Sequence, residues 1–222
     1  MTANSVSNQS RRPDRFAAAL AFGFIALLLA TELVLTLPDE NDGALFVAQF
    51  YAQHRTLIIS LQVLGLLDAV LLAGYAWRLR LVDRLVAVAG LVMAVCALAP
   101  TLLTLVLAIV ADPARTGSAA RWNMLEPRGD DILFVGIVLF AATVAVRLGR
   151  HTPTLGVPGL LVAVACLVRL ILEAAGKNRG AFEAIGPLSF VVLIATMGVL
   201  SLRGTLRSDP PAARESSPAA EW

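Results

Sequence analysis

Charge is scarce in this sequence. Asp, Glu, Lys and Arg make up 15% of its 222 residues, whereas soluble domains carry about 25%. Hydrophobic residues make up 58%, against about 45 to 50% in soluble domains. This balance excludes a soluble globular domain. A net charge of +2 also lacks the concentrated positive charge that nucleic-acid binding requires, so we expect no nucleic-acid partner.

Histidine and cysteine are equally scarce, with two of each. In the six-span topology that the apolar runs predict, His54 and His151 fall on opposite sides of the membrane and cannot share a metal. Cys96 and Cys166 lie at similar mid-membrane depth, where apolar packing is favoured over a disulfide. No CxxC, HExxH, GxSxG, GxGxxG or phosphate-loop motif occurs. The sequence thus gives no support for an enzyme, and we expect neither a cofactor nor a metal.

Apolar runs dominate what is present. Six runs are each long enough to cross a hydrocarbon core of about 30 Å, and because they are continuous rather than alternating they predict helices. We predict an all-α fold, a polytopic membrane helix bundle with six transmembrane helices within residues 15–204. The predicted spans are Phe16–Leu37, Thr56–Trp77, Leu85–Val110, Ile132–Leu148, Leu155–Leu172 and Ala184–Leu202.

The segments between and beyond the spans carry weaker signals. The polar ends, 1–14 and 205–222, predict disordered cytoplasmic tails because they offer too little apolar surface to offset ordering entropy. We expect Gly43–His54 to extend the second span above the membrane, with a separate interfacial helix as the alternative. Ala111–Gly129 is the longest connection, and a solvated loop explains it better than a binding loop.

Arginine positions predict the orientation. With the N-terminus inside, eleven arginines fall in cytoplasmic segments and six Lys or Arg residues fall outside. The bias is sharpest in the tight turns Arg78–Arg84 and Arg147–Arg150, where the positive-inside rule is most reliable. We therefore expect both termini in the cytoplasm and the lipid bilayer as the main partner, with a protein partner or a second copy of the chain left open.

Asp68 is the clearest functional clue, because it lies near the middle of the second span. An ionised side chain at that depth costs roughly 2.5 to 3.5 kcal/mol. The helical rise puts it level with Thr143 and Thr196, whose hydroxyls could hydrogen-bond it. Desolvation disfavours the charged form, so we expect Asp68 to be largely protonated. Two hypotheses follow: a neutral Asp that ties helices together, or a proton or cation relay.

Arg169 is a second charge within the spans. Because Arg stays charged in proteins, it must pair or reach the membrane surface. Glu173 lies one turn away on the same helix face, and Glu32 of the first span has similar height. We predict an outer ion-pair cluster of Glu32, Arg169 and Glu173 that joins the first and fifth helices. An anion or head-group pocket that opens outward is the alternative.

An internal repeat is weakly indicated. Residues 85–89 and 161–165 share the sequence Leu-Val-Ala-Val-Ala in the third and fifth spans. Parallel repeats occur in transporters, but in a chain so rich in Ala, Leu and Val we attribute this match to chance.

These features leave two functional hypotheses. The leading one is a structural or interaction membrane protein whose buried polar residues tie helices together. The alternative is a small-solute or proton-coupled transporter, with Asp68 as the titrating group and Arg169 and Glu32 near an outer gate. A lipid-modifying enzyme would need polar residues that converge near one leaflet, and only the outer cluster qualifies.

The layout resembles a broad group of bacterial six-helix membrane proteins of unknown function. The resemblance rests on the acidic first external loop, the segment Phe50–Arg55 that leads into an Asp-bearing second helix, and the short Arg turns before spans three and five. It covers about 16–204 and implies the six-helix architecture without catalytic residues. Seventeen arginines against the single Lys177 suggest a high-GC bacterium, such as an actinobacterium, and therefore the bacterial plasma membrane.

Overall fold

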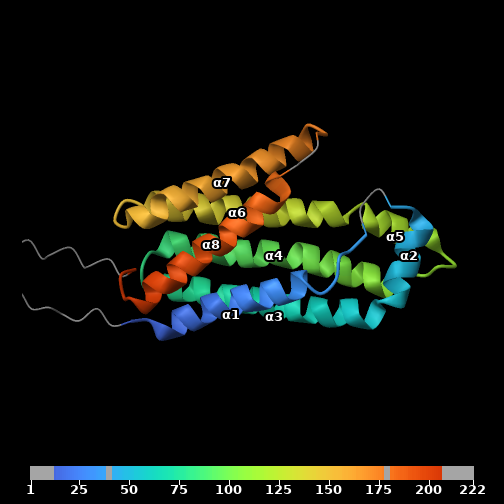
Figure 1. Ribbon diagram of the computed structural model, residues 1–222, viewed down its shortest axis with the longest axis horizontal. Helices are drawn as coiled ribbons and strands as arrows, with labels where there is room; N and C mark the ends of the chain where they lie inside the picture. The colour runs from blue at the N-terminus through green and yellow to red at the C-terminus, as the bar shows by residue number, and fades with distance from the viewer. Residues whose placement is uncertain (1–12, 39–41, 178–180, 207–222) are drawn as a thin grey trace, which may run out of the picture.

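The computed structural model describes residues 13–38, 42–177 and 181–206, and within them every regular element is an α-helix (Figure 1). Apart from residues 13–14 and 205–206, the predicted tails lie outside the described residues. The helices are α1 (Arg15–Glu32), α2 (Ala44–Gln53), α3 (Arg55–Leu79), α4 (Arg84–Val110), α5 (Thr116–Asn123), α6 (Glu126–Arg147), α7 (Pro153–Ala174) and α8 (Phe182–Leu202).

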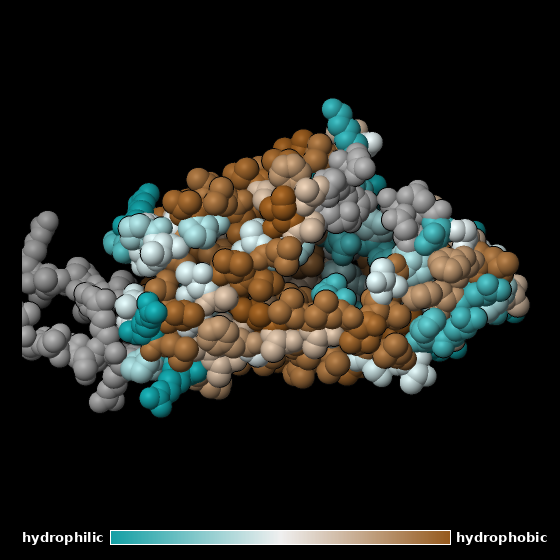
Figure 2. Space-filling model, viewed as in Figure 1, coloured by the Kyte–Doolittle hydropathy of each residue, from teal (hydrophilic) through white to brown (hydrophobic). Residues whose placement is uncertain are grey.

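Six of these helices are long and apolar enough to cross a membrane, as the sequence predicted. They form a ring in the order α1, α3, α4, α6, α7 and α8, in which each helix packs against the next and α8 returns to α1. The surface between the two ends of the ring is largely hydrophobic (Figure 2). A broad apolar belt of this kind is what lipid requires of a protein surface.

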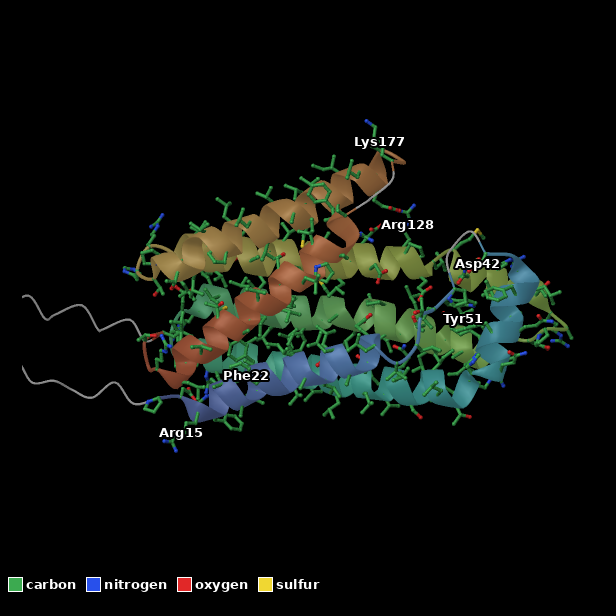
Figure 3. All side chains as sticks on the ribbon, in the orientation of Figure 1. Arg15, Phe22, Asp42, Tyr51, Arg128 and Lys177 are labelled. Atoms are coloured by element: carbon green, nitrogen blue, oxygen red, sulfur yellow. The ribbon has the colours of Figure 1, made fainter. Side chains whose placement is uncertain are left out.

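The two ends of the described chain meet at one end of the bundle. The Asp14 N–H donates a hydrogen bond of 2.9 Å to the Ser201 carbonyl, which joins the start of α1 to the end of α8. We name this end the tail end. The opposite end, where α2 and α5 lie across the bundle, is the cap end (Figure 1). Charged side chains gather at both ends: Arg15 at the tail end, and Arg128 and Lys177 toward the cap end (Figure 3).

Two helix boundaries differ from the predicted spans by more than two residues. α1 ends at Glu32 rather than Leu37, and the chain then leaves the helix on its way to Pro38, before which the helical conformation is disfavoured. α6 begins at Glu126 rather than Ile132. Pro127 stands in its first turn, where the fixed backbone angle of proline and its missing N–H suit a helix start.

The expectation that Gly43–His54 extends the second span is wrong. α2 is a separate helix, and the backbone at His54 (φ −102°, ψ 13°) breaks it from α3. Packing explains the break, because a turned α2 buries one face against α4 and α5. That small core consists of Val47, Ala48, Tyr51, Ile58, Leu107, Ala108, Ala111 and Ala119.

Two aspartates at the tail end each cap one helix and pair with another. Asp14 accepts a hydrogen bond from the Ala17 N–H at the start of α1 and pairs with Arg78 of α3 at 2.8 Å. Asp83 caps α4 in the same way and pairs with Arg147 of α6 at 2.9 Å. Each carboxylate thus satisfies a helix start and fixes the neighbouring helix end.

These two pairs reveal a repeat. Each arginine lies 64 positions after its aspartate, so Asp83 and Arg147 stand 69 positions after Asp14 and Arg78 (83 less 14, 147 less 78). The segments α1–α2–α3 and α4–α5–α6 have the same order, in which a short cap-end helix lies between two long ones, and they run in the same direction (Figure 1). We call these segments the first and second units.

Aromatic side chains fill the ring. Phe190 of α8 packs edge-on against Phe24 of α1 and Phe140 of α6, with ring centroids 6.1 and 6.4 Å apart. All three rings are at most 5% exposed. Because such edge-to-face contacts are favourable beyond the area that they bury, this layer closes the axis of the ring.

Replacing Asp83 tests the tail-end pairing. The Asp83→Ala protein should lose about 1 kcal/mol of stability from the missing cap, plus a smaller amount from the Arg147 pair, which is partly exposed. The Asp83→Asn protein should lose less, because Asn caps helices as well as Asp does. Thermal unfolding in detergent measures both, and equal losses in the two proteins would contradict the capping role.

The same carboxylate should give a pH dependence. Partial burial alone raises the pKa of Asp83, but hydrogen bonds from the Val86 N–H and the Arg147 side chain outweigh burial and lower that pKa. A lowered pKa stabilises the fold above the unfolded-state value of about 4, and this contribution is lost as the pH falls through the folded-state pKa. Asp83→Asn should therefore unfold with a weaker pH dependence below about pH 4 than the parent protein.

Candidate functional site

Asp68 lies on the buried face of α3. It shares this face with Leu72, Tyr75 and Leu79, at a spacing of four, seven and eleven residues that brings side chains to one side of a helix. The Asp68 side chain is among the few buried polar groups, and the residue is 7% exposed. The sequence therefore placed this carboxylate correctly within an apolar helix, and the fold turns it inward rather than toward lipid.

The Asp68 carboxylate has an orphan oxygen. Its Oδ1 is fully buried and receives no hydrogen bond from any residue that the structure describes. Glu32, at the end of α1, lies within electrostatic range of Asp68. A second carboxylate cannot neutralise the first. Burial and the neighbouring acid both disfavour two negative charges, so the site favours an added proton or another cation.

The two threonines predicted to serve Asp68 do not reach it. The Thr143 hydroxyl donates to the Leu139 carbonyl at 2.7 Å, and the Thr196 hydroxyl donates to the Val192 carbonyl at 2.8 Å. Both bonds stay within one helix, and neither α6 nor α8 adjoins α3 in the ring. The two threonines were predicted to lie at the same depth as Asp68. They do not contact it, because their helices are not neighbours of α3 in the ring.

Arg169 pairs with Asp131 rather than with Glu32 or Glu173. Its guanidinium NH1 lies 2.5 Å from Asp131 of α6, and its Cζ lies 4.1 Å from the centre of the Phe134 ring. The Arg169 side chain is only 1% exposed, whereas that of Asp131 is 18% exposed. The buried cation is therefore held by a carboxylate and an aromatic face of one neighbouring helix.

The ring explains why Glu32 does not meet Arg169, as the predicted cluster of Glu32, Arg169 and Glu173 requires. α1 packs against α3 and α8, whereas α7, which carries Arg169, packs against α6 and α8. Similar height on two helices that are not neighbours does not bring charges together. Glu32 instead stands near Asp68, and the joint that Arg169 makes is between α7 and α6.

Further polar groups line the cap-end half of α3, α4 and α6. The space beside Gly65 of α3 is filled by Thr101 of α4, whose hydroxyl lies 3.2 Å from where a Cβ would stand. One turn further along α4, Thr104 donates a hydrogen bond of 3.1 Å to Glu126 of α6. Tyr51 of α2 lies within electrostatic range of Glu126. These groups extend the polar environment from the cap-end loops into the bundle.

Sequence reasoning missed Asp131 and Glu126 as members of this region. It treated both as loop residues because they precede the apolar run that starts at Ile132. Two signals could have found them: Pro127 suits the first turn of a helix, and Asp131 stands one turn before Phe134 on that helix. A helix that began at Glu126 would have put Asp131 inside the bundle.

The surface between α1 and α8 contains a recess. Figure 2 shows hydrophilic atoms in a hollow between the cap-end parts of these two helices, with hydrophobic flanks on both sides. In Figure 1 the same region lies where α1 ends and α8 begins, in front of α4 and α6.

Metal chemistry finds no support in the described part of the chain. Across residues 13–38, 42–177 and 181–206 no group of three or more His, Cys, Asp or Glu side chains could hold a metal ion. Cys96 and Cys166 are free thiols. What the site offers is proton chemistry and charge pairing.

Comparison with known proteins adds no identification. No protein-family model, no curated protein and no solved structure matches the chain.

The Arg169–Asp131 pair predicts a large stability effect. Asp131→Asn removes the partner and leaves Arg169 charged and buried, which should cost about 3 kcal/mol or more. Arg128 also pairs with Asp131, at 3.3 Å, but its side chain is 68% exposed, so Arg128→Met should cost less than about 1 kcal/mol. Thermal unfolding in detergent compares them, and similar losses would contradict a buried pair that holds α6 to α7.

The threonines give the opposite prediction. Thr143→Val and Thr196→Val each remove a hydroxyl that bonds only its own helix, so each should change stability by less than about 1 kcal/mol. Unfolding curves recorded beside the parent protein measure this. A loss of several kcal/mol in either variant would restore the hypothesis that these hydroxyls tie helices together.

Proposed function

We propose that this protein is a small-solute or proton-coupled transporter in which Asp68 takes up and releases the proton. The observation that carries the proposal is the Asp68 carboxylate itself, which is buried within a helix long enough to span a membrane and has one oxygen without a hydrogen-bond donor. Keeping it ionised there costs several kcal/mol. A group that gains so much from a proton is suited to bind one.

The absence of a donor weighs against a purely structural role for Asp68. A carboxylic acid that ties helices together must exchange a hydrogen bond with a neighbouring helix. Thr143 and Thr196, the donors expected for that role, bond their own helices. Arg169, the buried cation that could neutralise Asp68, is held by Asp131. Within residues 13–38, 42–177 and 181–206, the charged group that acts on Asp68 is Glu32, and a second acid increases the need for a positive partner.

Access to the site is proposed from the cap end. The hydrophilic recess between α1 and α8 supports this direction (Figure 2). Toward the tail end the layer of Phe24, Phe140 and Phe190 fills the ring. The two Asp–Arg pairs hold the helix ends together there. A site open on one side and closed on the other is the arrangement that alternating access requires.

The two units are a second line of support. Transporters are often built from repeats, and parallel repeats turn about an axis along the membrane normal. Here α1–α2–α3 and α4–α5–α6 repeat in one direction, each with an Asp–Arg pair at its tail end. Such units can move relative to each other as bodies. We further propose that the tail end faces the cytoplasm of a bacterial cell, in line with its excess of arginine.

A structural or interaction role is the second candidate, and the Arg169–Asp131 pair favours it. This pair joins α6 to α7 without exposing charge, as a scaffold would need. A scaffold of this kind would bind a protein partner or a second copy of the chain. A structural role does not explain why the Oδ1 atom of Asp68 lacks a hydrogen-bond donor, and we therefore rank this candidate second.

Charge movement after a pH jump tests the transporter proposal without knowledge of the solute. Proton binding to a site inside the membrane displaces charge, so proteoliposomes on a solid-supported membrane should give a transient current when the pH on the cap side is lowered. Asp68→Asn should abolish the current. Asp112→Asn, an equivalent change in a cap-end loop, should leave it intact.

The two candidates give different outcomes. A current in the parent protein that is lost in a folded Asp68→Asn protein supports proton binding at Asp68. No current in the parent protein, or the same current in Asp68→Asn, removes the transporter proposal and leaves the scaffold. Dicyclohexylcarbodiimide, which modifies protonated carboxyls in apolar surroundings, supplies a second readout, because mass spectrometry should find the adduct on Asp68.

A further inference from the structure

A small cavity lies at the tail end, below the layer of aromatic rings. It has a volume of about 20 Å³, and its lining includes Asp14 and Ala17 of the α1 region, Arg78 of α3 and Ser201 of α8. A cavity needs about 10 to 15 Å³ to hold one water molecule, and that water needs two or more polar partners. The size of this cavity therefore suits one water.

Two buried polar atoms beside this cavity lack a hydrogen bond. The Arg78 Nε is fully buried and donates to no residue that the structure describes. The Tyr75 hydroxyl, one turn away on α3, is likewise buried without a hydrogen bond among the described residues. Tyr75 does not itself line the cavity, but its hydroxyl lies near Ser201, which does, and within electrostatic range of Asp14. Buried donors without a partner are rare, and an ordered water is the usual partner.

The second unit shows that this arrangement is specific to the first. Arg147 uses both Nε and NH2 to bind Asp83, at 2.9 Å each. Arg78 binds Asp14 through NH2 alone and leaves its Nε toward the interior. Of these two Asp–Arg pairs, only the one beside the cavity therefore has an arginine Nε–H that donates no hydrogen bond to a described residue.

The apolar positions of the second unit support the same conclusion. A shift of 69 positions relates Asp68 to Ile137 and Tyr75 to Val144. Both counterparts are buried and apolar, so the fold does not itself demand polar groups at these positions. The first unit alone carries a polar series on one helix face, from Asp68 through Tyr75 to the Arg78–Asp14 pair.

We propose that a water molecule binds in this cavity between Arg78 and Ser201, and that this water and the Tyr75 hydroxyl beside Ser201 form the tail-end relay, the last part of the path along which the Asp68 proton moves. The second part rests on the proposed function, whereas the water site does not. Seven residues of helix separate Asp68 from Tyr75, about 10 Å along the axis. The buried Leu72 lies between them on the same helix face, so this stretch must admit water briefly for a proton to pass.

The transfer leaves Tyr75, the water and Asp14 unchanged, while Asp68 becomes a carboxylate that can take up the next proton. A proton from the Asp68 carboxyl arrives through water at the Tyr75 oxygen while the proton of that hydroxyl passes to the cavity water. The water in turn gives a proton to the Asp14 carboxylate, from which it leaves at the tail end. One O–H bond breaks for each that forms, and rotation of the hydroxyl restores the phenol. Tyr75 is therefore a relay and a positioning residue for the water.

Tyr75→Phe tests this tail-end relay, and Tyr51→Phe is the matched control. Both tyrosines are fully buried with hydroxyls that lack a hydrogen bond among the described residues, but Tyr51 lies at the cap end. In liposomes with uniform orientation, Tyr75→Phe should slow the current after a tail-side pH jump by about tenfold or more. The current after a cap-side jump and the carbodiimide adduct on Asp68 should persist. Tyr51→Phe should keep the tail-side current of the parent protein, because Tyr51 lies at the opposite end of the bundle.

Each result separates this inference from the proposed function. If Tyr75→Phe leaves the tail-side current unchanged, Tyr75 is not part of the proton path. A parent protein that gives a current only after a cap-side pH jump would contradict the tail-end relay as well. Loss of all currents in the parent protein, or their survival in Asp68→Asn, overturns the transporter proposal itself. For the water site alone, a high-resolution structure of the full chain should show density within hydrogen-bond distance of Arg78 Nε. A side chain packed against that atom would exclude it.

Discussion

The constraint on which this structure depends is that each charge inside an apolar ring needs a partner on an adjacent helix. Asp14 and Asp83 meet it by capping one helix and pairing with the arginine that ends another. Arg169 meets it through Asp131 and the face of Phe134. For the fully buried Arg169, loss of the partner would cost several kcal/mol, whereas the two tail-end pairs are partly exposed and contribute less.

Asp68 is the exception to this rule, and the exception gives it functional weight. Its oxygen has no donor, and its charged neighbour is an acid. Arg78 and Arg169 each keep a buried Nε without an acceptor, but both side chains are paired with a carboxylate, whereas no group of opposite charge pairs with Asp68 among the described residues. Where a protein departs from such a rule, for example with an unsatisfied buried polar group, the position is often part of a functional site. The comparison with Ile137 in the second unit sharpens this, because an apolar residue fills the equivalent position.

The sequence was sufficient for the helices but not for the order of the ring. Apolar runs fixed six spans, because length and continuity are properties of each segment alone. Asp68 and Arg169 were recognisable for the same reason. Their partners were not, because depth along the membrane normal follows from counting residues, whereas position around a ring depends on which faces pack. Thr143 and Thr196 were chosen by depth, but they lie on helices that do not adjoin α3. Asp131 was not predicted as a partner because Pro127 was not recognised as part of the start of a helix.

The long helices differ in length, so the apolar surface is taller on one side of the bundle than on the other. At 1.5 Å per residue the 27 residues of α4 measure about 40 Å, whereas the 18 residues of α1 measure about 27 Å. A hydrocarbon core of about 30 Å matches the shorter helix and falls well short of the longer. A bilayer around the bundle would therefore have to be thinner beside α1 than beside α4. Longer acyl chains would increase the mismatch at the shorter helix.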